Sequence, residues 1–265
     1  MSEPAIQLPQ FRVFSILGQS FLILFRNFVP FALISIFIMS PPYIYLYVSE
    51  PNNLADGSIG SSAGFLDIVD IILSYFVTAA LVFGVFQSLR GQPVSIFQSV
   101  SRGLAVIFPV IGVIIIMGII WAALGALMYG AAVVASDNVV ATIVLAIIVI
   151  ILTVYIICIF WVVVPAAAVE GRVLSSFGRS IYLTKGNRWR VFGLLFMVGI
   201  ISAIVGAIAG GVGGAIGSNS SAVLLTWAAT ALATAFSSVV ATVAYYRLCL
   251  VKDGVPENEI AAVFD

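Results

Sequence analysis

The 265-residue chain is 62% hydrophobic and only 8% charged, and its eleven Lys and Arg residues are balanced by eleven Asp and Glu residues. Soluble domains carry about 25% charged residues, so this composition excludes an ordinary soluble fold and predicts an all-α polytopic membrane protein. The zero net charge gives no reason to expect a nucleic-acid partner. Without His and with only two Cys, a His-containing or Cys-rich metal site is excluded, and we expect no cofactor.

The distances between charged residues predict six membrane spans. A helix needs about 20 apolar residues to cross the hydrocarbon core, and five windows of the chain are long enough and free of charge. The last window, 191–246, is too long for one crossing, and "GSNSS" at 217–221 favours a turn inside it. The predicted spans are 28–49, 66–89, 108–133, 139–164, 191–215 and 222–246. We treat residues 1–265 as one membrane domain that ends in a short tail, 248–265.

Each segment that precedes an odd-numbered span has the periodicity of an amphipathic helix. These segments, 10–27, 95–104 and 172–184, place Arg, Gln and Ser on one face and apolar residues on the other, which is typical of helices that lie in the membrane interface. "VFSILGQS" at 13–20 and "VLSSFGRS" at 173–180 share a pattern. We therefore predict a threefold repeat of one interfacial helix and two spans. Its units are about 10–90, 94–165 and 172–247.

Alternate sides of the predicted bundle differ in charge. All eleven cations fall on one side, whereas the opposite side receives Glu50, Asp56 and Asp137 and no cation. Because Lys and Arg accumulate in cytoplasmic loops, we expect both termini to be cytoplasmic.

The stretch "GRSIYLTKGNRWRV", 178–191, gathers Arg179, Lys185, Arg188 and Arg190 directly before an apolar run. Basic residues at headgroup depth attract anionic lipid, and Trp189 is the residue type that anchors at that level. We therefore expect these five residues to contact anionic phospholipid. The alternative is that the cations only fix orientation, with one of them paired to Glu170.

The third repeat unit also carries a family resemblance. "VEGRVLSSFGRSIYLTKGNRWRVFGLLF" and the later "AYYRLCLVKDG" resemble the membrane domain of bacterial glycerophosphoryl diester phosphodiesterases and related six-span inner-membrane proteins. The matching positions are Glu170, Gly171, Ser180, Leu183, Thr184, Gly186, Arg188, Trp189, Tyr246, Arg247, Asp253 and Gly254. The resemblance implies a six-helix module of a bacterial inner membrane.

In fused members of that family, a soluble phosphodiesterase barrel follows the membrane part. Such a barrel needs about 250 residues, and only 11 residues follow Gly254. No catalytic residue is carried over from the resemblance, and we expect the chain not to be an enzyme.

Asp67 and Asp70, in "GFLDIVD", are the acids nearest to a predicted span, and their spacing places them on one helix face. Carboxylates inside a membrane are usually functional, which would make them a cation or proton site. Alternatively, they lie in the first turns of the second span at the outer surface, where a helix N-terminus favours anions.

Two patterns of small residues predict helix packing. The fifth span carries Gly206, Gly210 and Gly214, and the sixth carries Thr226, Thr230 and Thr234. Glycines at such spacing let helices approach closely, and threonines bond within or between helices. A flexible gate and a polar pore lining are the respective alternatives. We also expect Pro41 and Pro42 to kink or end the first span.

These observations favour a lipid-associated or protein-interaction scaffold. Its expected partners are the lipid bilayer, anionic phospholipids, and another membrane protein or a second copy of the chain. The alternatives are a small-solute transporter or channel that uses the bundle interior, and an intramembrane enzyme. Cys158 and Cys249 are expected to be packing residues.

Overall fold

The computed structural model describes residues 11–49, 63–134, 138–216 and 219–254. Within these ranges 91% of the residues are helical and none lies in a strand, which confirms the all-α class. The predicted outer acids Glu50, Asp56 and Asp137 lie outside the described residues. The helices are α1 (Val13–Arg26), α2 (Phe28–Ile38), α3 (Ser40–Ser49), α5 (Ala63–Leu89), α6 (Ile96–Ala105), α7 (Ile107–Val134), α8 (Val139–Phe160), α9 (Val163–Glu170), α10 (Val173–Thr184), α11 (Arg188–Ile216) and α12 (Asn219–Asp253).

By length and composition, five helical stretches of the described chain can cross a membrane: α5, α7, α8 continued by α9, α11 and α12. A sixth is counted if α1 and α2, which meet at 86°, form one bent span. That angle also suits a helix that lies along the interface and then turns into the bilayer. The protein is therefore a multi-pass membrane protein.

The predicted first span, 28–49, is divided into α2 and α3 at Met39. Pro41 and Pro42 lie in the first turn of α3, where a missing N–H is tolerated. Because Pro41 cannot donate to the carbonyl oxygen of Phe37, the helix cannot continue through this point. The Ser40 hydroxyl donates to that oxygen instead, at 2.8 Å. The expected proline break is confirmed.

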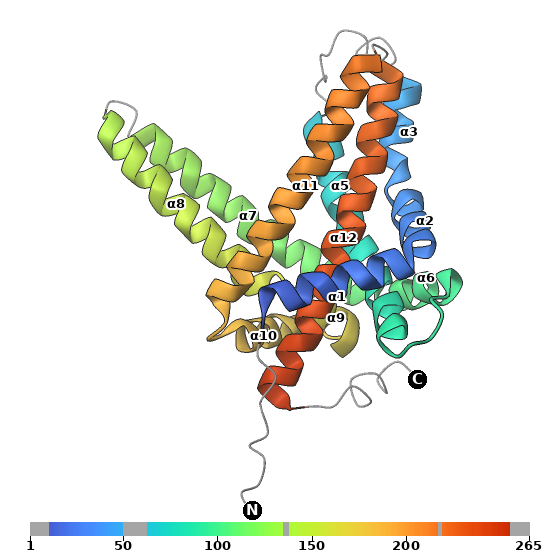
Figure 1. The fold of residues 1–265 in the computed structure, drawn as a ribbon. Helices are drawn as coiled ribbons and strands as arrows, with labels where there is room; N and C mark the ends of the chain where they lie inside the picture. The colour runs from blue at the N-terminus through green and yellow to red at the C-terminus, as the bar shows by residue number, and fades with distance from the viewer. Residues whose placement is uncertain (1–10, 50–62, 135–137, 217–218, 255–265) are drawn as a thin grey trace, which may run out of the picture.

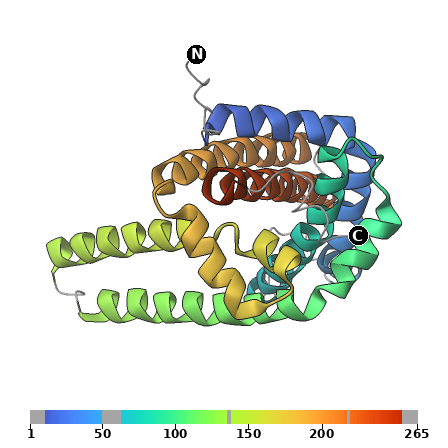
Figure 2. The same cartoon turned by 90° about the horizontal axis from the view of Figure 1, so that it is seen from below.

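One end of the molecule is a layer of short helices. α1, α6, α9 and α10 lie there, across the ends of the long helices (Figures 1 and 2). The eleven Lys and Arg residues fall in these helices, in the turns beside them, or at the adjoining ends of α11 and α12. We call this end the basic layer.

Each interfacial helix uses the same positions in the same way. The second residues of α1, α6 and α10 are Phe14, Phe97 and Leu174, and they are 79–82% exposed. The eighth residues are Ser20, Gly103 and Ser180, and all three are buried. Each helix therefore presents a large apolar side chain outward and a small residue toward the neighbouring helices.

The long helices do not form one uniform bundle. α12 is central, and it packs against α1, α2, α5 and α11. The hairpin of α7 and α8 diverges from these helices as it leaves the basic layer (Figure 1). The foot of the hairpin is buried, where Val110, Val113 and Met117 of α7 pack against Ala79 of α5 and Ala167 of α9. The outer part of the hairpin exposes apolar side chains along its length.

Candidate functional site

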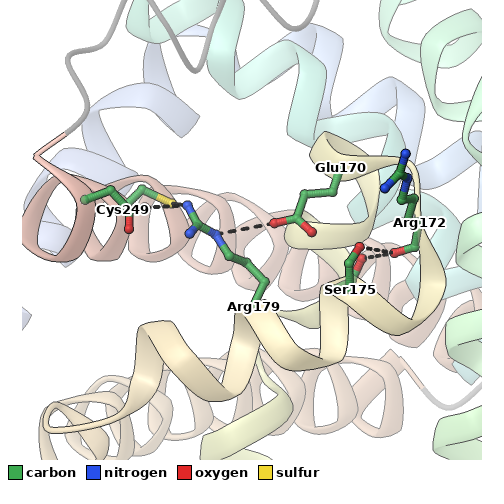
Figure 3. A network of polar contacts seen from close by, with 7 residues as sticks. Glu170, Arg172, Ser175, Arg179 and Cys249 are labelled. Carbon is green, nitrogen blue, oxygen red and sulfur yellow. Dashed lines mark hydrogen bonds and ion pairs between the residues drawn. The ribbon is translucent and has the colours of Figure 1, made fainter.

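A network of charged side chains joins three helices within the basic layer. Arg179 of α10 lies between Glu170, at the end of α9, and Asp253, at the end of α12. Figure 3 shows Arg179 extending between Glu170 and Cys249. Its Nε is 3.3 Å from Oε1 of Glu170, and its Nη2 donates to Oδ2 of Asp253. The same Nη2 lies 3.8 Å from the Sγ of Cys249. Arg179 thus connects helix ends that are distant in sequence.

Local chain geometry brings these groups together. Gly171 caps α9 in a left-handed conformation with φ of 65°, which permits the sharp reversal from α9 into α10. The reversal places Arg179, two turns into α10, beside Glu170. Burial alone would lower the pKa of the Arg179 guanidinium, but the hydrogen bond to Asp253 and the nearby negative charge raise it overall. The guanidinium therefore remains charged.

Three further arginines also bind partners within the protein. Arg247 of α12 donates from Nε and Nη2 to Oε1 of Gln19, at 3.0 and 2.7 Å, and so fastens α12 to α1. Arg190 donates to the carbonyl oxygen of Phe11 at 3.2 Å. Arg188 donates to the Tyr155 hydroxyl, and its guanidinium carbon lies 4.9 Å from the centre of that ring.

The five residues expected to contact anionic lipid therefore differ in their surroundings. Arg179, Arg188 and Arg190 have partners within the protein. The alternative predicted from the sequence, that one cation pairs with Glu170, applies to Arg179. Lys185 is exposed, and its ammonium group makes no hydrogen bond or ion pair within the described ranges. Trp189 is 85% exposed. Lys185 and Trp189 are thus the members of the cluster most open to the surroundings.

Asp67 and Asp70 lie in the first two turns of α5, at the opposite end of this 27-residue helix from the basic layer. Asp67 is exposed. Asp70 is half-buried, and its Oδ2 accepts a hydrogen bond of 3.2 Å from the Tyr43 hydroxyl, which also bonds Thr230. The two carboxylates therefore do not share one environment, and Asp70 is turned toward α3 and α12.

Within the described chain, the prediction that the glycines of α11 make a close helix contact is wrong. Gly206, Gly210 and Gly214 are exposed, and a Cβ added to any of them would meet no atom within 4 Å. These glycines therefore make no close contact with a neighbouring helix, although α11 and α12 pack side by side.

Close approaches occur instead at glycines that sequence reasoning missed. A Cβ added to Gly103 would lie 2.9 Å from the Cα of Ala80, and one added to Gly112 would lie 2.5 Å from Val173. These positions dock α6 on α5 and α7 on α10. The sequence signal for Gly103 is that the predicted repeat aligns it with Ser20 and Ser180.

A hydroxyl-lined groove lies near the middle of the long helices. It has a volume of about 450 Å³, and its lining comes from α5, α11 and α12. Thr230 and Thr234 belong to the lining, whereas Thr226 does not. Thr78 and Ser238 join their hydroxyls across the α5–α12 contact at 2.8 Å. Thr230 and Thr234 therefore form part of the polar lining of the groove. Helices pack through hydroxyl groups instead at Thr78 and Ser238.

Cys158 and Cys249 are free and buried, as expected for packing residues. Comparisons with known protein families, curated protein sequences and solved structures find no match. The resemblance to the membrane domain of glycerophosphoryl diester phosphodiesterases therefore rests on the motifs quoted above. Several of those motif residues, Glu170, Arg247 and Asp253 among them, hold the basic layer together.

Proposed function

We propose that the protein is a non-enzymatic, lipid-associated membrane module that binds anionic phospholipid at its basic layer. On this proposal it belongs to a bacterial inner membrane, with the basic layer and both termini in the cytoplasm. The observation that carries the proposal is the exposure of Trp189 and Lys185 beside Arg188 and Arg190.

The chemistry of this surface suits a headgroup region. Trp prefers the level of the lipid headgroups, and each cation near an anionic surface contributes about 1 kcal/mol before screening by salt. The exposed Phe14, Phe97 and Leu174 give each interfacial helix an apolar side chain that can enter the bilayer. Cations and apolar anchors in one layer support binding to lipid.

We expect the triple variant Lys185→Gln, Arg188→Gln and Arg190→Gln to retain several-fold less anionic phospholipid than the wild type. Arg179 is left intact because it holds the layer together. Co-purified phosphatidylglycerol and cardiolipin are measured by native mass spectrometry after confirming topology.

The matched control is Arg12→Gln, Arg26→Gln and Arg102→Gln, which removes the same charge at exposed positions elsewhere in the layer. Equal losses in the two triple variants would point to general attraction rather than a site. Unchanged retention in the first variant would make the cluster a topology signal only.

Reporter fusions after Gly60 and after Gly254 are expected to give opposite signals, because all the cations lie on one side of the predicted bundle. An alkaline phosphatase fusion should be active at the first site, and a green fluorescent protein fusion should fluoresce at the second. Matching signals at the two sites would overturn the count of six spans.

Transport of a small polar solute is the second candidate, favoured by the hydroxyl groove between α5, α11 and α12. The groove is open, however, and no residue of the α7–α8 hairpin lines it. A solute pathway must be shielded from acyl chains. The open groove is therefore better suited to a lipid than to a dissolved solute.

A further inference from the structure

A second space lies beside the hydroxyl groove, at the foot of the α7–α8 hairpin. This second space has a volume of about 210 Å³, and Ser74, Thr78 and Ser237 line both. Met117 and Trp121 of α7 form part of its far wall. We call the two spaces together the crevice. It has a polar wall on α5, α11 and α12 and an apolar wall on the hairpin.

The polar wall offers neutral hydrogen-bonding groups. Among the described residues, no charged side chain lines either space. The hydroxyls of Ser202 and Ser237 make no hydrogen bond within the described part of the chain, although both lie near the middle of their helices. A hydroxyl that faces hydrocarbon without a partner is unfavourable. The groove therefore favours an occupant that brings its own polar group.

The apolar wall is suited to acyl chains. In the most hydrophobic windows of the two hairpin helices, only 22% and 17% of the residues are buried inside the molecule. The hairpin diverges from α11 and α12 above its foot (Figure 1). A chain that lies along the hairpin can therefore extend from the crevice into the surrounding bilayer.

We propose that the crevice binds a neutral lipid whose polar end is a hydroxyl or an ester, of the diacylglycerol class. The polar end lies against Ser202 and Ser237, and an acyl chain lies along Met117 and Trp121. An anionic phospholipid is disfavoured because no cation is available to its phosphate. This site is separate from the basic layer and does not rest on the anionic-lipid proposal.

The test uses the full-length protein in phosphatidylcholine nanodiscs that contain a diacylglycerol with a diazirine on one acyl chain. After irradiation, labelled peptides are identified by mass spectrometry. We expect saturable labelling of the α7 and α12 segments that line the crevice. Unlabelled diacylglycerol should compete, and phosphatidylglycerol should not.

Two variants remove the site in different ways. The double variant Ser202→Ala and Ser237→Ala deletes hydroxyls that have no protein partner, and its labelling should fall about fivefold to tenfold, as for two hydroxyl bonds in a membrane. Gly206→Leu places a side chain in the groove, where an added Cβ meets no atom within 4 Å, and should abolish the labelling. Both should keep the fold.

The matched controls are Thr226→Val, which removes a hydroxyl of α12 outside the groove, and Gly199→Leu, which adds a side chain to α11 outside it. Both controls should label like the wild type. The proposal would be overturned if labelling did not saturate or if phosphatidylglycerol competed as well as diacylglycerol. Labelling that persisted in the double serine variant would overturn it too.

Discussion

Arg179→Gln is expected to lower the free energy of unfolding by about 2 to 4 kcal/mol, between the values for an exposed and a fully buried ion pair. The side chains of Arg179, Glu170 and Asp253 are 29%, 26% and 16% exposed, so solvent screens the network only in part. Removing the guanidinium leaves two carboxylates, from α9 and α12, facing the same space. Their repulsion adds to the lost attraction.

Thermal unfolding in detergent measures this effect, with Arg172→Gln as the control because Arg172 is exposed on the same segment (Figure 3). Adding Asp253→Asn to Arg179→Gln should recover part of the loss, since only one carboxylate then remains. If the Arg179→Gln and Arg172→Gln variants are equally stable, the network does not hold the basic layer together.

The network also bears on the proposed lipid surface. Arg179 fixes α10 against α9 and α12, and α10 leads directly into the turn that carries Lys185 and Trp189. From the sequence, Arg179 is expected to be one of four similar contacts to lipid. In the structure it instead positions α10. Its partner Asp253 lies 74 residues away, and no local pattern connects the two.

The positions of the long helices could be predicted from the sequence because hydrocarbon excludes charge. The predicted span 108–133 corresponds to α7, 107–134, and the predicted span 191–215 corresponds to α11, 188–216. The interfacial helices were equally readable, because a helix between water and lipid must be amphipathic. The predicted segment 172–184 became α10, 173–184.

The neighbours of each residue could not be predicted in the same way. In a membrane, both the lipid and the protein interior are apolar, so a stripe such as Gly206 and Gly210 does not reveal which one it faces. The hydroxyl groove was missed for a related reason. Ser74 of α5, Ser202 of α11 and Ser237 of α12 meet only in the folded bundle.

The predicted repeat offers a signal that distinguishes the two kinds of glycine. Gly103 occupies the position of Ser20 and Ser180, and all three face neighbouring helices. Ser180 donates to the carbonyl oxygen of Ile159 at 2.5 Å, which shows how closely α10 approaches α8. Gly103 lacks even a Cβ, and α6 approaches the backbone of α5.

Gly103→Ala is therefore expected to destabilise the protein by about 1 to 3 kcal/mol, the usual cost of overpacking a tight contact. The new Cβ would lie 2.9 Å from the Cα of Ala80 and 3.1 Å from its Cβ. Backbone atoms cannot rotate away, so α6 must shift from α5. Helix propensity opposes this loss, because alanine in place of glycine favours a helix by about 1 kcal/mol.

Gly210→Ala is the matched control, since Gly210 is helical and exposed and has no atom near an added Cβ. There only the helix propensity acts, and the variant should be as stable as the wild type or more stable by up to about 1 kcal/mol. Thermal unfolding of both variants in the same detergent gives the comparison. If Gly103→Ala proves as stable as Gly210→Ala, α6 is not docked on Ala80 through this glycine. A lower stability for Gly210→Ala alone would mean that α11 has a close partner outside the chain.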